Sequence, residues 1–232
     1  QALADSIADD MAEYIWRVRE EYVDQQFPMP KEAVQITKKA IANQQTPVAL
    51  GDYSDRPGDA TWILSELIDK EVGKVLYAAL RDEFALEALK EQNAQPGDLF
   101  SSKVGGITGE QAGPAVQIDG EVLFFGPQWG YDHVAAIGFG NDNVLIITPT
   151  YEQIIRPESL RFGPINPDDF DVFVVKSRVH FRRGFDETGY AKTIQVVDAP
   201  GDWFGTIRIN ALEYEFGPID QLYPFNTETI DY

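Results

Sequence analysis

The 232-residue sequence contains no cysteine, and it has only two histidines and two methionines. The absence of cysteine excludes disulfide bonds, thiolate metal sites and a cysteine nucleophile. It also fits a reducing compartment, so we expect a cytoplasmic protein. A catalytic zinc needs three converging protein ligands. Because His133 and His180 stand far apart and form no His-x-His or His-Glu-x-x-His motif, we expect no catalytic zinc and no metal ligands in this chain.

Basic residues are scarce: 19 Lys and Arg stand against 38 Asp and Glu, which gives a formal net charge of −19 and a pI near 4.3. Nucleic acids and anionic membranes bind through concentrated Lys and Arg. We therefore expect neither as a partner. Long apolar runs are lacking too, since none approaches the ~20 residues of a membrane span.

Apolar residues at three- and four-residue steps predict a long N-terminal helix. Its face consists of Leu3, Ile7, Met11, Tyr14, Ile15, Val18 and Tyr22. Pro28 and Pro30 end this helix, and Pro30 suits the first turn of a second helix that reaches Gln44. The apolar face of the second helix would use Ala33, Val34, Ile36, Ala40 and Ile41. We interpret residues 1–45 as a helical lead-in that ends a missing N-terminal domain, because the chain opens inside an amphipathic helix that needs a packing partner.

At Pro47 the pattern changes to alternating short strands and helices, which is typical of an α/β fold. The predicted order is strand 48–50, a helix marked by residues 62–68, strand 75–80, a helix marked by residues 84–89, and a β-rich region from residue 99. We therefore predict an α/β domain over residues 46–232, with a mixed sheet flanked by helices.

The second half of the domain is predicted to be mostly strands. Residues 115–125 alternate strongly, and Asp119-Gly120 would suit a hairpin turn. Residues 134–139 and 144–148 flank a second hairpin turn. A short helix at 157–160, strand 172–175, helix 179–185 and strand 193–197 follow. The last connection is short for a crossover, so parallel pairing of its two strands stays open. After Pro200 we predict irregular structure that wraps the domain.

A polar cluster follows strand 172–175 and is the most informative feature of the chain. It consists of Lys176, Ser177, Arg178, His180, Arg182 and Arg183. Open α/β sheets gather their ligand chemistry at the C-terminal ends of strands. A cationic cluster in so acidic a chain indicates an anionic ligand, such as a carboxylate or phosphate. The alternative is a buried ion-pair network. Ser177 beside Lys176 also suits a Ser–Lys nucleophile, although adjacent residues of a strand point to opposite sides.

The first predicted strand leads into a loop that carries Asp52, Asp55 and Asp59. A phosphate cradle needs more glycines and a lysine. These carboxylates suit a cation, a metal-bound water or a substrate amine instead. The structural alternative is that Asp59 caps the next helix and Asp55 makes a turn.

Two other loops carry weaker signals. Residues 105–114 are rich in glycine, which allows close backbone approach to a ligand, although a plain mobile loop has the same composition. Trp129 and Tyr131, beside His133, would line a peptide-binding wall; alternatively, they form a covered loop with a surface histidine.

The motif Val174-Val175-Lys176-Ser177-x-x-His180-Phe181-Arg182, followed by Gly184-Phe185 and the segment 193–201, resembles the C-terminal domain of the MlrC-like family. These are metal-dependent peptidases named for a bacterial enzyme that cleaves linearised microcystin. The resemblance runs in order from Pro47 to Asn226. It includes Gly105-Gly106, Gly113-Pro114, the strand 144–148 and the closing Leu222-Tyr223-Pro224. It also favours one long bent strand over a hairpin at Asp119-Gly120.

The resemblance implies a hydrolase of peptides or related amides whose zinc ligands lie in an N-terminal domain outside this chain. His180 and Lys176 would then be catalytic, with Arg182, Ser177, Asp52 and Asp55 binding substrate. The family usually shows Asp-Asn-Pro and several glycines in the acidic loop, whereas here Arg56 replaces the Asn and Gly58 alone remains. The alternative function is a non-catalytic structural or ligand-binding domain.

Overall fold

The computed structural model describes residues 1–22, 27–53, 55 and 57–200. The described residues fall into two compact units, one with residues 1–22 and one with residues 27–53, 55 and 57–200. In the first unit, helix α1 (Ala2–Val18) is followed by the 3₁₀ helix η1 (Arg19–Tyr22). The α-helix thus ends before Tyr22. None of its residues is buried, and Leu3, Ile7, Met11, Tyr14 and Ile15 of its predicted apolar face are exposed. The irregular structure predicted after Pro200 lies outside the described residues.

Helix α2 (Pro30–Ala42) belongs to the second unit, where it packs against α3, β1 and β8. Its buried residues are Pro30, Ala33, Val34, Thr37 and Ala40. The prediction of Ile36 in this face was wrong, since its side chain is 38% exposed. Thr37 takes a buried position instead, because its hydroxyl donates to the carbonyl of Ala33 at 2.8 Å and is thereby satisfied.

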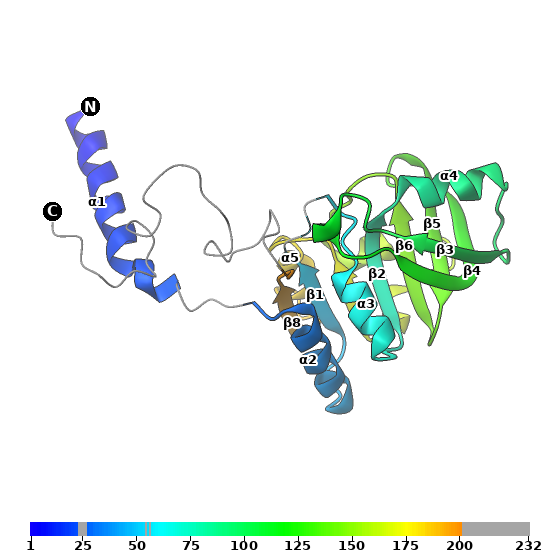
Figure 1. The fold of residues 1–232 in the computed structure, drawn as a ribbon. Helices are drawn as coiled ribbons and strands as arrows, with labels where there is room; N and C mark the ends of the chain where they lie inside the picture. The colour runs from blue at the N-terminus through cyan, green and yellow to red at the C-terminus, as the bar shows by residue number, and fades with distance from the viewer. Residues whose placement is uncertain (23–26, 54, 56, 201–232) are drawn as a thin grey trace. The chain divides into compact units, whose positions relative to one another are not determined.

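One sheet of eight strands forms the core of this unit, in the order β3-β4-β5-β6-β2-β7-β1-β8 (Figure 1). The strands are β1 (Val48–Asp52), β2 (Val75–Arg81), β3 (Leu99–Val104), β4 (Val116–Gln128), β5 (Tyr131–Phe139), β6 (Asn143–Thr148), β7 (Val172–Val175) and β8 (Thr193–Val197). The five strands from β6 to β8 are parallel, and β3, β4 and β5 continue the sheet in antiparallel pairs. The predicted mixed α/β sheet is confirmed.

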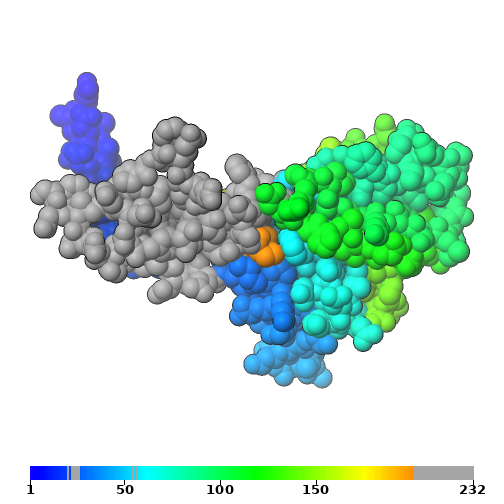
Figure 2. Space-filling model, in the orientation of Figure 1, coloured from blue at the N-terminus to red at the C-terminus, as the bar shows by residue number. Residues whose placement is uncertain are grey.

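The sheet has a hydrophobic core on each face. On one face lie α2, α3 (Trp62–Asp69) and α4 (Glu83–Glu91), whose buried residues join one cluster. Helices α2 and α3 lie side by side over it and, with β3 and β4, form much of the face seen in Figure 2. Phe181 and Phe185, at the short helix α5 (Arg182–Phe185), pack into the cluster on the opposite face. No described helix is long and apolar enough to span a membrane.

The alternating segment 115–125 lies in one long strand, β4, so the hairpin at Asp119-Gly120 is wrong and the long strand is confirmed. Asp119 and Gly120 stay in register with Ser101 and Phe100 of β3. A bulge between Val122 and Phe124 accommodates the bend. The predicted hairpin of β5 and β6 is confirmed.

Strands 172–175 and 193–197, whose pairing the sequence left open, are parallel but do not pair with each other. Both β7 and β8 run parallel to β1, which lies between them. The connection therefore passes over β1, with α5 and the 3₁₀ turns before it on the face opposite α3. The short helices η2 (Glu110–Ala112), η3 (Pro157–Leu160) and η4 (Pro167–Asp169) complete the connections.

Candidate functional site

The site lies at the C-terminal ends of β1 and β7, which are neighbours in the sheet. The chain leaves β1 through α3 on one face and leaves β7 through α5 on the other. Connections that diverge in this way leave the strand ends uncovered between them, which is where open α/β sheets bind their ligands. Asp52 ends β1, and Lys176 follows β7 directly.

Lys176 is completely buried and forms the centre of an ion-pair cluster. Its Nζ lies 2.9 Å from Asp52 Oδ2 and 2.6 Å from Asp55 Oδ2. It also donates to the carbonyl of Ala60 at 2.7 Å and contacts the Tyr77 hydroxyl at 3.0 Å. The cation that the acidic loop holds is therefore the chain's own lysine. For Lys176, the alternative of a buried ion-pair network is what the structure contains.

In this cluster the two carboxylates of Asp52 and Asp55 share the single ammonium of Lys176. The buried negative charge therefore exceeds the buried positive charge. Desolvation raises the pKa of Asp52 to about 6, although the charge of Lys176 opposes the shift. For Lys176, burial alone would lower the pKa, but Asp52 and Asp55 outweigh it and hold the pKa well above its usual value. Burial raises the pKa of the Tyr77 phenol as well. Lys176 is therefore a permanently charged ammonium.

The acidic loop is fixed by its own carboxylates. Asp55 accepts from the backbone N–H of Gly58 at 2.7 Å and of Ala60 at 2.8 Å, which confirms the turn. Asp59 does not cap α3. It accepts instead from the backbone N–H and hydroxyl of Thr108, each at 2.6 Å. The capping prediction failed because Asp59 lies two residues before the N-cap, Thr61, and faces the glycine-rich loop 105–114.

Ser177 turns away from Lys176 and joins a different network. Its Oγ accepts from the backbone N–H of Phe181 and from the side-chain amide of Gln153, both at 3.2 Å. The Oε1 of the same Gln153 lies 3.3 Å from His180 Nδ1. No described bond joins Ser177 to Lys176, so the Ser–Lys dyad is not formed. Gln153 instead connects a buried serine to an exposed histidine.

The arginines of the cluster lie outside this buried centre. The guanidinium of Arg178 stacks over the ring of Tyr53, with its Cζ 4.6 Å from the ring centroid. Arg182 is exposed and lies 3.6 Å from Asp186, one helical turn onward. Of the six predicted site residues, Lys176, Asp52 and Asp55 meet in the interior, Ser177 is buried beside them, and His180 and Arg182 are exposed.

The family model described as MlrC C-terminus matches residues 50–208. The chain belongs to this family. The predicted resemblance is thereby confirmed, and the matched range includes both the acidic loop and the cluster after β7.

One solved structure, named "Putative metallopeptidase", from Mesorhizobium sp. BNC1, has a similar fold with a TM-score of 0.60 and 17% sequence identity. The match covers 82% of this chain but 40% of that one, so the chain spans less than half the length of its structural relative. At this identity the likeness shows the fold alone. No curated protein matches the chain.

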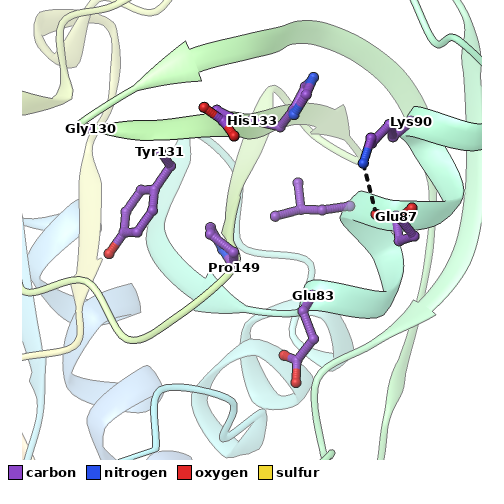
Figure 3. Close-up of a pocket in the computed structure, with 9 residues that line it drawn as sticks. Glu83, Glu87, Lys90, Gly130, Tyr131, His133 and Pro149 are labelled. Carbon is purple, nitrogen blue, oxygen red and sulfur yellow. Dashed lines mark hydrogen bonds and ion pairs between the residues drawn. The ribbon is translucent and has the colours of Figure 1, made fainter.

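The described part of this MlrC C-terminal domain contains no group of three or more His, Asp or Glu side chains placed to hold a metal. His133 lies apart from the site, stacked on Phe125 with ring centroids 4.9 Å apart. Figure 3 shows it in a pocket of about 400 Å³ between α4 and the start of β5, where Lys90 pairs with Glu87. Tyr131 lines the same pocket, whereas Trp129 lies in a different groove. The single peptide-binding wall predicted from these rings is therefore not formed.

Two residues of the site escaped the sequence analysis. Tyr77 lies in the middle of β2, where its fully buried hydroxyl donates to Ala60 at 3.1 Å and contacts Lys176. A tyrosine inside an apolar strand was the available signal, because a buried hydroxyl needs a polar partner. Gln153 lies in an irregular segment and gave no local signal.

Proposed function

We propose that this chain is the C-terminal domain of a metal-dependent hydrolase that acts on peptides or related amides. In this proposal a catalytic zinc is held by an N-terminal domain, and the present chain supplies residues to the shared cleft. Membership of the MlrC C-terminus family supports it. The similar protein named as a metallopeptidase, which is more than twice as long as the matched part, supports it further.

The observation that carries the proposal is that the Lys176–Phe185 segment is anchored by buried residues and exposes the side chains of His180 and Arg182 between them. Lys176 fixes the segment to the acidic loop through two carboxylates. Three and five residues after Ser177, His180 and Arg182 are exposed beyond the strand ends. A catalytic cleft requires polar groups held on a rigid support, because small displacements of a catalytic group lower the reaction rate strongly.

Each predicted site residue has a role in this proposal. His180 donates a hydrogen bond or proton to the developing oxyanion, and Arg182 holds a substrate carboxylate. Lys176, Asp52 and Asp55 act by positioning the segment and the loop, since Lys176 has no exposed surface. Ser177 orients Gln153 beneath His180.

The test is turnover by the longer protein that contains the upstream domain. His180→Ala is expected to lower kcat at least ~10²-fold, as for loss of an acid–base group. Arg182→Gln is expected to raise KM with a smaller effect on kcat. Arg161→Gln provides a matched control, because Arg161 is also exposed and ion-paired, with Asp168 at 2.8 Å, but belongs to another segment.

The second candidate is a structural or binding domain without catalysis, and the completeness of the Lys176 cluster favours it. Every polar contact of the Lys176 ammonium is made within the chain. In that case, His180→Ala would leave turnover unchanged. Lys176→Met would then lower only the free energy of unfolding, by about 3–5 kcal/mol, because it leaves two buried carboxylates without a cation. Unchanged kcat in His180→Ala would therefore exclude the catalytic proposal.

A further inference from the structure

A groove of about 340 Å³ lies beside the Gln153–His180 contact, and none of its lining residues except Gln153 has a part in the roles above. It is lined by Trp129, Glu152, Gln153, Ile154, Ile155, Arg156, Ser159 and Arg183. We call it the Trp129–Arg183 groove. Its lining combines an aromatic ring and two isoleucines with two arginines, and pockets with an apolar wall and a few placed charges are suited to small organic ligands.

The groove is held together by close packing. A Cβ on Gly184 would overlap the carbonyl oxygen of Ile155 and lie 2.7 Å from Arg156 Cα, so this glycine lets α5 approach the segment 155–156 closely. The indole N–H of Trp129 donates to the Ser159 carbonyl at 3.1 Å. Three separate segments thus meet in one fixed arrangement.

The two arginines of the groove differ from three described arginines of this unit that pair with a carboxylate, one of which is Arg81 with Glu83. Arg161 and Arg182 each pair with an aspartate. The guanidinium groups of Arg156 and Arg183 form no ion pair with any described residue, although acidic residues outnumber basic ones two to one in the sequence. Glu152 also lines the groove, and its carboxylate, whose Oε2 accepts from the Tyr131 hydroxyl at 3.0 Å, offsets one of the two positive charges. Two guanidiniums are therefore available to an anion.

We propose that the Trp129–Arg183 groove binds a carboxylate carried next to an apolar side chain, as at the C-terminal residue of a linear peptide or in an N-acyl amino acid. The guanidiniums match a carboxylate in charge and shape, and the ring of Trp129 with the two isoleucines receives the apolar side chain. A bare phosphate would use the arginines and leave the apolar wall empty. This inference rests on the proposed function, because the groove would hold the C-terminal end of the substrate of the proposed hydrolase.

Binding can be measured on the 232-residue chain itself, without metal or turnover. The probe is N-acetyl-L-leucine, and the matched ligand is N-acetyl-L-leucinamide, which lacks the carboxylate. The readout is the indole N–H signal of Trp129 in ¹H–¹⁵N NMR spectra, identified among the signals of four tryptophans with Trp129→Phe. A saturable shift with the acid and none with the amide is expected, with a Kd of about millimolar order for so small a ligand.

Variants separate the groove from its surroundings. Arg156→Gln and Arg183→Gln are each expected to weaken binding about tenfold, as for loss of a charge-assisted hydrogen bond. Arg161→Gln is the matched control: Arg161 is also exposed, but it lies outside the groove and already pairs with Asp168. It is expected to change the affinity less than about twofold. A leucine-ended tripeptide, with a free or an amidated C-terminus, tells a peptide end from a free amino-acid derivative.

Equal shifts with the amide, an equal loss in Arg161→Gln, displacement by inorganic phosphate at the same concentration, or no shift at all would each overturn the inference. Its failure is distinguishable from failure of the proposed function. Turnover by the longer protein that persists without groove binding refutes the groove alone, whereas groove binding in an inactive longer protein refutes the hydrolase alone.

Discussion

At the scale of single residues, Lys176 is the group on which the site depends. Its ammonium joins the acidic loop, which follows β1 directly, to Tyr77 of β2, and both are distant from Lys176 in sequence. Burying one cation with two carboxylates is costly unless every group is hydrogen-bonded. The cost falls mainly on Asp52, whose pKa burial raises to about 6, since both oxygens of Asp55 also accept backbone N–H bonds.

The raised pKa of Asp52 predicts that the free energy of unfolding decreases as pH rises. Its pKa is about 6 in the folded chain, against an ordinary value of 3.8. The folded state therefore holds a proton between these values that the unfolded state has released. The free energy of unfolding should fall as pH rises from about 4 to about 6, by roughly 3 kcal/mol from this group. The side chain of Asp52→Asn cannot ionise. In urea titrations at several pH values, the free energy of unfolding of this variant should therefore rise relative to that of the native chain between about pH 4 and about pH 6.

Asp55→Asn is the control for Asp52→Asn. Its two oxygens accept from Gly58 and Ala60, so an amide N–H would face a donor there. It should lose stability at every pH, by about 1–3 kcal/mol. Stability curves for the native chain and Asp52→Asn that run parallel from pH 4 to 7 would show that Asp52 titrates normally.

The Gln153 contact predicts the tautomer of neutral His180. If the Gln153 amide donates to Ser177, its oxygen faces His180 Nδ1 and accepts its proton, which leaves Nε2 of the neutral ring without a proton. The donation to the oxyanion proposed above then requires the protonated imidazolium, in which Nε2 also carries a proton. Long-range ¹H–¹⁵N NMR spectra should show the Nδ1–H form for His180, and Gln153→Leu should return it to the Nε2–H form. His133 is the internal reference, as the other histidine of the chain. An Nε2–H form in the native chain would mean that Gln153 donates to His180 instead.

At the scale of secondary-structure elements, the site depends on how closely the segment after β7 crosses the end of β1. The ring of Phe181 and the carbonyl of Ser177 lie directly over Gly51 of β1. This contact carries the chain from β7 over β1 towards β8, and it places His180 beside the strand ends.

Gly51→Ala should therefore displace the segment that carries His180. Its Cβ would lie 2.7 Å from Phe181 Cζ and 2.9 Å from the Ser177 carbonyl oxygen. The Ser177 carbonyl belongs to the backbone, so it can move away only if the segment itself shifts. We expect a loss of about 1–3 kcal/mol in urea unfolding. Gly126→Ala in β4 is the matched control, because its Cβ would make an ordinary contact at 3.5 Å with Phe124. Equal stability of the two variants would show that the crossing is loosely packed.

The elements were largely predictable from the sequence, because apolar runs such as 172–175 and the turn at 140–143 report on local structure. The side-chain partners were not. Lys176 was predicted to be catalytic, and its burial could not be foreseen because the ion pairs that bury it involve Asp52 and Asp55, more than a hundred residues away in sequence. Asp59 suited a helix cap by position, but Thr108 offered two donors. The role of Gln153 depends on the path of an irregular segment.

At the scale of the whole molecule, the chain has the fold and the family membership of an MlrC C-terminal domain. Its described residues include no metal-binding group. The proposed hydrolase therefore needs ligands from elsewhere, and the exposed apolar face of α1, with Leu3 and Ile15 more than half exposed, fits a further packing partner.

The most direct test of this account is the zinc content of the 232-residue chain after dialysis, measured together with its cleavage of a panel of linear peptides. The account predicts no stoichiometric zinc and no cleavage by this chain, and both by a longer protein that carries the proposed N-terminal domain. Loosely bound Ca²⁺ or Mg²⁺ would agree with the account, since carboxylates are abundant. A stoichiometric zinc that survives dialysis, with peptide cleavage abolished by a chelator, would contradict it and place the active site within this chain.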